Sequence, residues 1–107
     1  MGKGVPKLET IQFTKESEIF SFMNIDNFAL TKITLAKHES VKDVGNDLGG
    51  LLHLISGDAI VTVGGSLKEL RSDTVLKIPK GFSINIKAKA FSVLYLLERI
   101  KPKPIPL

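Results

Sequence analysis

Apolar residues recur at every second position in short runs along most of the chain, and Gly, Asn, Asp or Ser separates the runs. This spacing is typical of β-strands, in which successive side chains point to opposite faces of a sheet. Helical spacing is nearly absent, and only "TKESEIFSFM" (14–23) could form a helical turn, with Thr14 as its N-cap. The pattern predicts an all-β protein.

Tight turns such as "NIDN", "SGD" and "VGGS" separate about ten predicted strands, and Gly or Asn supplies the positive φ that such turns need. Strands joined in this way pair antiparallel, and they must close into a barrel or stack as two sheets to protect their edges. The predicted strands are Leu8–Phe13, Ile19–Met23, Phe28–Ala36, Ser40–Val44, Leu51–Ser56, Ala59–Val63, Ser66–Leu70, Thr74–Ile78, Phe82–Lys87 and Phe91–Glu98.

The 107 residues are enough for one domain with one core, without disulfides or a structural metal. We expect the strands within 1–27 to pack on a barrel formed by 28–98. The remaining segment, 99–107, is a tail rich in Pro and Lys, and the three prolines of "KPKPIPL" keep it out of a central strand.

The absence of cysteine excludes disulfide scaffolds, zinc ribbons, iron–sulfur clusters and thiol nucleophiles. The first ten residues contain no apolar signal-peptide region, and the longest apolar stretch, "FSVLYLL", is too short to span a bilayer. We therefore expect a cytoplasmic protein with no membrane partner.

Charge is unevenly distributed along the chain, which has a net charge of +4. Residues 1–66 carry 6 basic and 8 acidic groups, whereas residues 67–107 carry 9 basic and 3 acidic groups. A basic half can attract phosphate or nucleic acid, but aromatic residues do not alternate with these lysines as base stacking requires. We expect no nucleic-acid partner; such a binder would use Lys77, Lys80, Lys87 and Lys89.

Two stretches, "KHESVKDVGNDLGGLLHLISG" and "DTVLKIPKGFSINIKA", resemble the two sequence motifs of the cupin superfamily. The first motif has glycine, histidine, histidine, glutamate and glycine at fixed spacing, and its places fall without a gap on His38, Val44, Asn46, Gly50 and Gly57. The second has glycine, proline, glycine and histidine, and its places fall on Asp73, Pro79, Gly81 and Ile84. Residues 58–72 separate the motifs, and the resemblance covers 30–98.

The resemblance implies a double-stranded β-helix, or jelly-roll, barrel of about ten antiparallel strands, and a homodimer. In the family, the two histidines and the glutamate of the first motif, with the histidine of the second, bind a divalent metal inside the barrel. Here Val44, Gly50 and Ile84 offer no side-chain lone pair, and Asn46 alone is a weak ligand. We therefore predict no metal and no cofactor.

Strand alternation predicts an apolar lumen. If Ile84 points inward, Phe82 and Ile86 do so as well, and Leu52 and Leu54 point inward beside Gly50. Such a lumen is either a packed core or a pocket for a mostly apolar small molecule. The candidate ligand-binding residues are Val44, Asn46, Leu52, Leu54, Phe82, Ile84 and Ile86.

No other group of residues predicts catalysis. His53 should face outward as a packed or interface residue, and His38 should lie in a surface loop. A new metal site from His38, Glu39, Asp43 or Asp47 would need a turn that gathers these side chains, and we do not expect one. Tyr95 is expected in the core, with its hydroxyl at the rim.

The glycines Gly45, Gly49 and Gly50 do not indicate a phosphate-binding loop, because no Lys-Ser/Thr pair and no helix follow them. Gly49 and Gly50 instead predict a bulge or tight turn.

The sequence favours a metal-free, non-catalytic barrel that binds a small, largely apolar ligand in its lumen or serves as an assembly module. The alternative is a cupin enzyme, similar to a sugar isomerase or a dioxygenase, with an unrecognised metal or acid–base site.

Overall fold

The computed structural model describes residues 5–6, 8–11, 28–45 and 48–101, and these residues confirm the all-β prediction. They form nine strands: β1 (Glu9–Ile11), β2 (Phe28–Leu35), β3 (Ser40–Val44), β4 (Gly50–Ser56), β5 (Asp58–Val63), β6 (Ser66–Arg71), β7 (Thr74–Ile78), β8 (Ile84–Ala88) and β9 (Ser92–Arg99). The predicted strand Ile19–Met23, the possible helical turn at 14–23 and the end of the tail lie outside the described residues. No helix among the described residues is long and apolar enough to cross a membrane.

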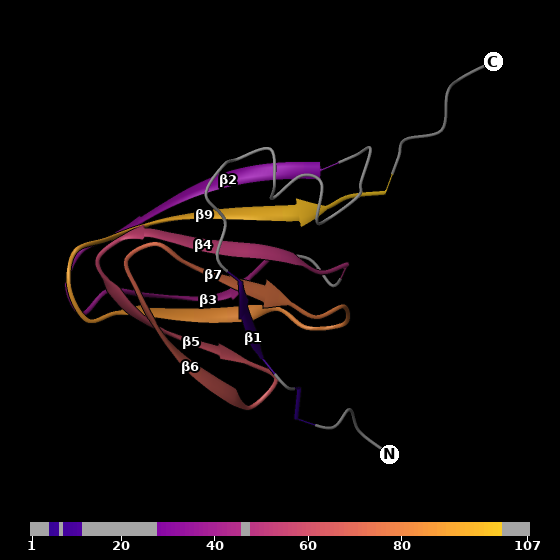
Figure 1. The fold of residues 1–107 in the computed structure, drawn as a ribbon, viewed down its shortest axis with the longest axis horizontal. Helices are drawn as coiled ribbons and strands as arrows, with labels where there is room; N and C mark the ends of the chain where they lie inside the picture. The colour runs from indigo at the N-terminus through magenta and orange to yellow at the C-terminus, as the bar shows by residue number, and fades with distance from the viewer. Residues whose placement is uncertain (1–4, 7, 12–27, 46–47, 102–107) are drawn as a thin grey trace.

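Two antiparallel sheets face each other, as a jelly-roll barrel requires (Figure 1). One sheet has the strand order β1-β7-β4-β9-β2, and the other has the order β3-β8-β5-β6. The predicted strand Phe82–Lys87 begins two residues late, because Gly81, with a φ of 97°, is still in the turn before β8. Phe82 nevertheless packs against the core from this turn.

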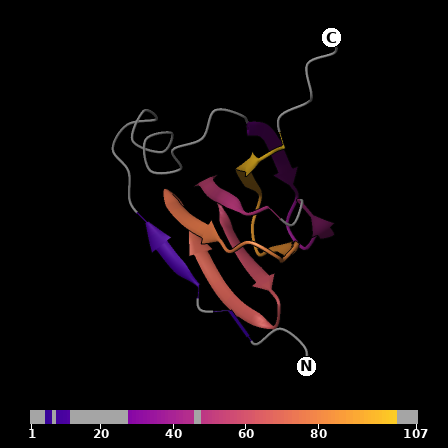
Figure 2. The same cartoon turned by 90° about the vertical axis from the view of Figure 1, so that its right-hand side faces the viewer.

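The two ends of the barrel differ in how the chain passes between the sheets. At one end, here called the closed end, four connections join the sheets: β2 to β3, β4 to β5, β6 to β7 and β8 to β9. At the other end, the open end, lie the connections that follow β3, β5 and β7 (Figure 1). Figure 2 is viewed toward this open end.

Hydrogen bonds fasten the closed end. The buried Ser92 hydroxyl donates to the Ala90 carbonyl at 2.8 Å and accepts from the Asp58 amide at 3.2 Å. The Asp73 amide donates to the Leu54 carbonyl at 2.7 Å. These bonds satisfy backbone groups that the sharp turns leave without a strand partner.

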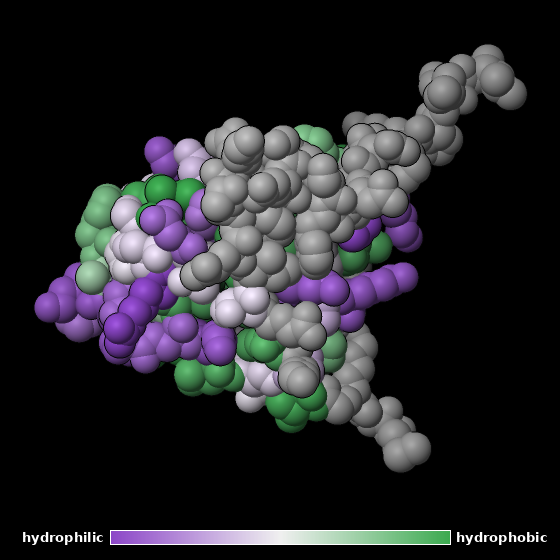
Figure 3. Space-filling model, in the orientation of Figure 1, coloured by the Kyte–Doolittle hydropathy of each residue, from purple (hydrophilic) through white to green (hydrophobic). Residues whose placement is uncertain are grey.

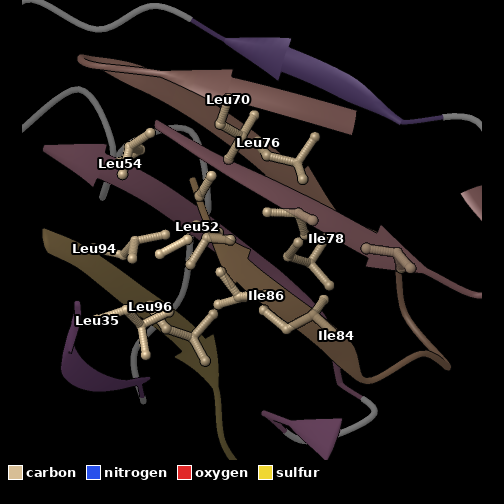
Figure 4. Close-up of a cluster of buried hydrophobic side chains, with 14 residues drawn as sticks. Leu35, Leu52, Leu54, Leu70, Leu76, Ile78, Ile84, Ile86, Leu94 and Leu96 are labelled. Atoms are coloured by element: carbon tan, nitrogen blue, oxygen red, sulfur yellow. The ribbon is translucent and has the colours of Figure 1, made fainter. Parts of the chain in front are cut away.

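The space between the sheets is filled by side chains that alternate along the strands, and those labelled in Figure 4 point toward one another. Full burial of one leucine or isoleucine contributes about 1.5–3 kcal/mol, so this cluster is the main source of stability. Its members are Leu35, Leu52, Leu54, Ala59, Val61, Val63, Leu70, Leu76, Ile78, Ile84, Ile86, Ala88, Leu94 and Leu96.

The five-stranded sheet also buries apolar residues on its outer face. Leu51, Val75 and Leu97 alternate with core residues and lie outside the central cluster, yet they are at most 5% exposed. Strand registry places Leu51 opposite Leu97 on the neighbouring strand β9. This sheet is therefore apolar on both faces.

Gly57 has no space for a side chain, so we expect Gly57→Ala to destabilise the protein strongly. Its φ is 109°, and an added Cβ would lie 2.5 Å from the Phe91 carbonyl oxygen and 2.4 Å from the Ser92 hydroxyl. Backbone strain and the clash together should cost about 3 kcal/mol or more in the free energy of unfolding, measured by urea denaturation.

Gly65→Ala is the matched control, because Gly65 also has a positive φ of 93° but only an ordinary 3.7 Å contact at the added Cβ. It should cost about 1–2 kcal/mol, from backbone strain alone. Equal costs for the two variants would contradict the close packing at Gly57.

Candidate functional site

Three of the four places that hold metal ligands in the cupin motifs meet in one recess at the open end. Val44 and Ile84 are paired across strands β3 and β8, and Gly50 begins β4 beside them. Asn46 lies outside the described residues. The recess has a volume of about 10 Å³, which is about the space for one water molecule.

Glu98 supplies a carboxylate at this recess, and the sequence analysis did not single it out. It lies opposite Gly50 in the registry of β4 and β9, and a Cβ built on Gly45 would lie 3.4 Å from its Oε2 atom. The alternation of β9 could have identified it, because Glu98 shares its inward face with Leu94 and Leu96.

The described residues of the recess do not offer the donors that a divalent transition metal needs. Val44 and Ile84 are apolar, and at Gly50 even a Cβ would lie 2.1 Å from the Leu97 carbonyl oxygen. A glutamate at Gly50 would therefore require β4 and β9 to move apart. Nowhere in the described part of the chain do three His, Asp or Glu side chains gather as a metal site, and one carboxylate is too small a donor set.

The turn geometry of the motifs is retained although the ligands are absent. His38 and Asp73 occupy the places of the two leading glycines, and they have φ values of 73° and 65°. The remaining motif glycines, Gly57 and Gly81, have φ values of 109° and 97°. Positive φ is the conformation that favours glycine, so all four positions keep the backbone that the motif requires.

The described residues among those predicted to line a ligand lumen, all except Asn46, pack against one another or against the core. Leu52, Leu54, Ile84 and Ile86 are at most 1% exposed and belong to the central cluster (Figure 4). Val44 and Phe82 are partly buried against it. A ligand larger than a water molecule would have to push these side chains apart.

Neither histidine lies in the interior. His53 is partly buried on the outer face of β4, where its registry partners are Val75 and Tyr95. Burial lowers the pKa of His53, and the negative charge of Asp73 partly opposes this effect. His38 is exposed in the turn between β2 and β3.

A second, larger pocket lies at the open end, and it opens outward between the ends of β4, β7 and β9. Its volume is about 520 Å³, within the range of small-molecule sites. Three segments that are far apart in the sequence form this pocket, and no local sequence pattern indicates it. The described lining residues are Leu48, Gly49, Gly50, Leu51, Lys77, Ile78, Pro79, Lys80, Arg99, Ile100 and Lys101.

The four lysines considered for nucleic-acid binding are divided between two regions. Lys77 and Lys80 line this pocket. Lys87 lies on β8 in the other sheet, and Lys89 forms an ion pair with Glu69 at 2.9 Å, at the opposite end of β8.

Similarity to known structures is found for the whole fold. No protein-family model and no curated protein match the sequence. The crystal structure of a cupin superfamily protein from Desulfitobacterium hafniense DCB-2 superposes with a TM-score of 0.64 at 16% identity, over 94% of this chain and 84% of that one. This chain has a cupin-like fold.

A second solved structure has a similar fold. A conserved protein of unknown function from Streptococcus pyogenes superposes with a TM-score of 0.64 at 13% identity, over 92% of this chain and 77% of that one.

Removal of metal should leave the cupin-like barrel intact. Because the recess lacks a sufficient donor set, we expect the melting temperature to be the same with and without EDTA, by calorimetry. Elemental analysis of the purified protein checks this independently. Stoichiometric nickel, zinc, iron or manganese together with a lower melting temperature in EDTA would contradict the prediction.

The lowered pKa of His53 makes stability depend on pH. The unfolded chain binds the His53 proton more readily than the folded chain, so this residue should destabilise the fold as pH falls below about 6.5. We expect His53→Gln to lose less stability than wild type between about pH 7.5 and about pH 5.5, by urea denaturation. His38→Asn, at the exposed turn, should retain the wild-type loss, and an unchanged loss in His53→Gln would refute the assignment.

Proposed function

We propose that this protein binds a small, largely apolar ligand without catalysing its conversion, and that the ligand occupies the 520 Å³ pocket at the open end. The observation that carries the proposal is the difference in volume between the recess and the outer pocket. The recess between the sheets holds about 10 Å³, whereas the outer pocket is about fifty times larger (520 against 10 Å³). The outer pocket therefore accommodates a ligand without disrupting the core.

The floor of this pocket is apolar. Leu51, Ile78 and Ile100 come from three different segments and line it together with Leu48 and Pro79. Apolar side chains and a few polar groups at the margin are the usual lining of small-molecule sites, because apolar burial supplies most of the affinity.

Close backbone contacts hold the walls of the pocket together. The Arg99 amide donates to the Gly49 carbonyl at 3.1 Å, which joins the end of β9 to the turn before β4. On the other side, a Cβ on Gly49 would lie 3.0 Å from the Ile78 carbonyl oxygen and 3.3 Å from the Lys80 amide. These contacts preorganise the pocket, and preorganisation lowers the entropy cost of binding.

A binding role fits the described chemistry better than an enzymatic one. Both histidines lie away from the recess, since His53 faces outward and His38 lies at the closed end. A histidine paired with an interior carboxylate, as considered for a cupin enzyme, is therefore not what the described residues offer.

The neutral probe 1-octanol tests this proposal by two-dimensional amide NMR. We expect saturable shifts at the amides of Gly49, Leu51, Lys80 and Ile100. Ile100→Asn should weaken octanol binding about three- to tenfold, because Ile100 contributes apolar wall area.

Phe91→Asn is the matched control, because Phe91 is also an exposed apolar residue, 61% exposed, but lies at the closed end. It should leave octanol binding unchanged. Absence of saturable shifts, or shifts confined to Leu52, Ile84 and Ile86 in the core, would overturn the proposal.

A further inference from the structure

We propose that the ligand of the open-end pocket is an amphiphile with a carboxylate or phosphate head group and a single apolar chain. This inference rests on the proposed function, since it names the chemical class that the same pocket selects. It comes from the charge of the side chains around the pocket. The apolar floor alone would not distinguish an anionic ligand from a neutral one.

Four cationic side chains line the pocket, and they come from two of its three segments. Lys77 and Lys80 flank Ile78 and Pro79 at the end of β7, and Arg99 and Lys101 flank Ile100 at the end of β9. In each segment apolar lining lies between two cations. Figure 3 shows hydrophilic residues projecting at this end of the molecule.

No acidic residue is among the described residues that line this pocket. Glu98 precedes Arg99 in the sequence, but it lies on the inner face of β9 and lines the small recess instead. The alternation of β9 thus separates the carboxylate from the guanidinium, one inside the barrel and one outside. The described lining of the outer pocket is therefore net positive.

Cations around a concave apolar floor favour a ligand that has both an anionic group and an apolar part. Lys and Arg stems can lie along apolar surface while their charged ends remain at the margin, where they meet an anionic head group. A lysine ammonium binds a carboxylate or phosphate as a point charge, and Lys80 and Lys101 supply two such groups at this margin. The apolar chain would then lie over Leu51, Ile78 and Ile100.

The test compares three eight-carbon probes that differ only in head group: octanoate, 1-octanol and octylammonium. By calorimetry and amide NMR, we expect octanoate to bind at least about fivefold more tightly than 1-octanol, and octylammonium more weakly than either. The preference for octanoate should decrease as salt concentration rises, because the pocket margin is exposed to solvent. Octyl phosphate should show the same preference.

Charge removal at the pocket provides the second measurement. Lys80→Gln/Lys101→Gln should weaken octanoate binding about fivefold and so reduce the preference for octanoate over 1-octanol. Lys87→Gln, which removes one charge on the other sheet, should change neither. Circular dichroism confirms that each variant keeps its strands.

The outcomes separate this inference from the proposed function. Equal binding of octanoate and 1-octanol, or tighter binding of octylammonium, would overturn the anionic class while the apolar site stands. Loss of octanoate binding in Lys87→Gln equal to that in the double variant would overturn it as well. Absence of binding by all three probes would overturn the proposed function itself.

Discussion

The interior of this barrel is closed by its own side chains, and the rest of the structure depends on that packing. Leucines, isoleucines and valines from both sheets meet between them, and cluster members such as Leu52, Leu54 and Leu94 have no exposed surface at all. A filled interior keeps two sheets together in a chain that has no cysteine for disulfides. It also leaves little space at the places that hold metal ligands in the cupin motifs.

The backbone conformation of the motif turns and the metal-ligand side chains have different physical roles. The turns can therefore be present where the ligand side chains are absent. His38 and Asp73 still adopt the positive φ of the motif glycines because the turns at the closed end determine where the chain crosses between sheets. A ligand side chain at Val44 or Ile84, by contrast, contributes nothing to a turn. An apolar residue there adds burial and stabilises the barrel.

Most of the fold was predictable from local patterns, whereas the outer pocket was not. Strand alternation and turn residues identify all nine of the described strands and the inward faces of β4 and β8, because these signals extend over only a few residues. The open-end pocket depends on the ends of β4, β7 and β9 lying side by side, and this follows from topology. The excess of Lys and Arg after residue 66 was visible in the sequence, but the placement of four of these cations around one pocket was not.

The absence of a side chain at Gly50 and the shape of the outer pocket depend on the same close approach of two strands. With no side chain at Gly50, the backbone of β9 approaches so closely that a Cβ would meet the Leu97 carbonyl oxygen at 2.1 Å. The same approach allows the Arg99 amide to reach the Gly49 carbonyl, which brings Arg99 and Lys101 to the wall opposite Lys77 and Lys80. A glutamate at Gly50 would push β9 away, and the hydrogen bond that closes this wall would then be lost. In this chain, a glutamate at Gly50 and the observed approach of β9 to β4 are therefore mutually exclusive.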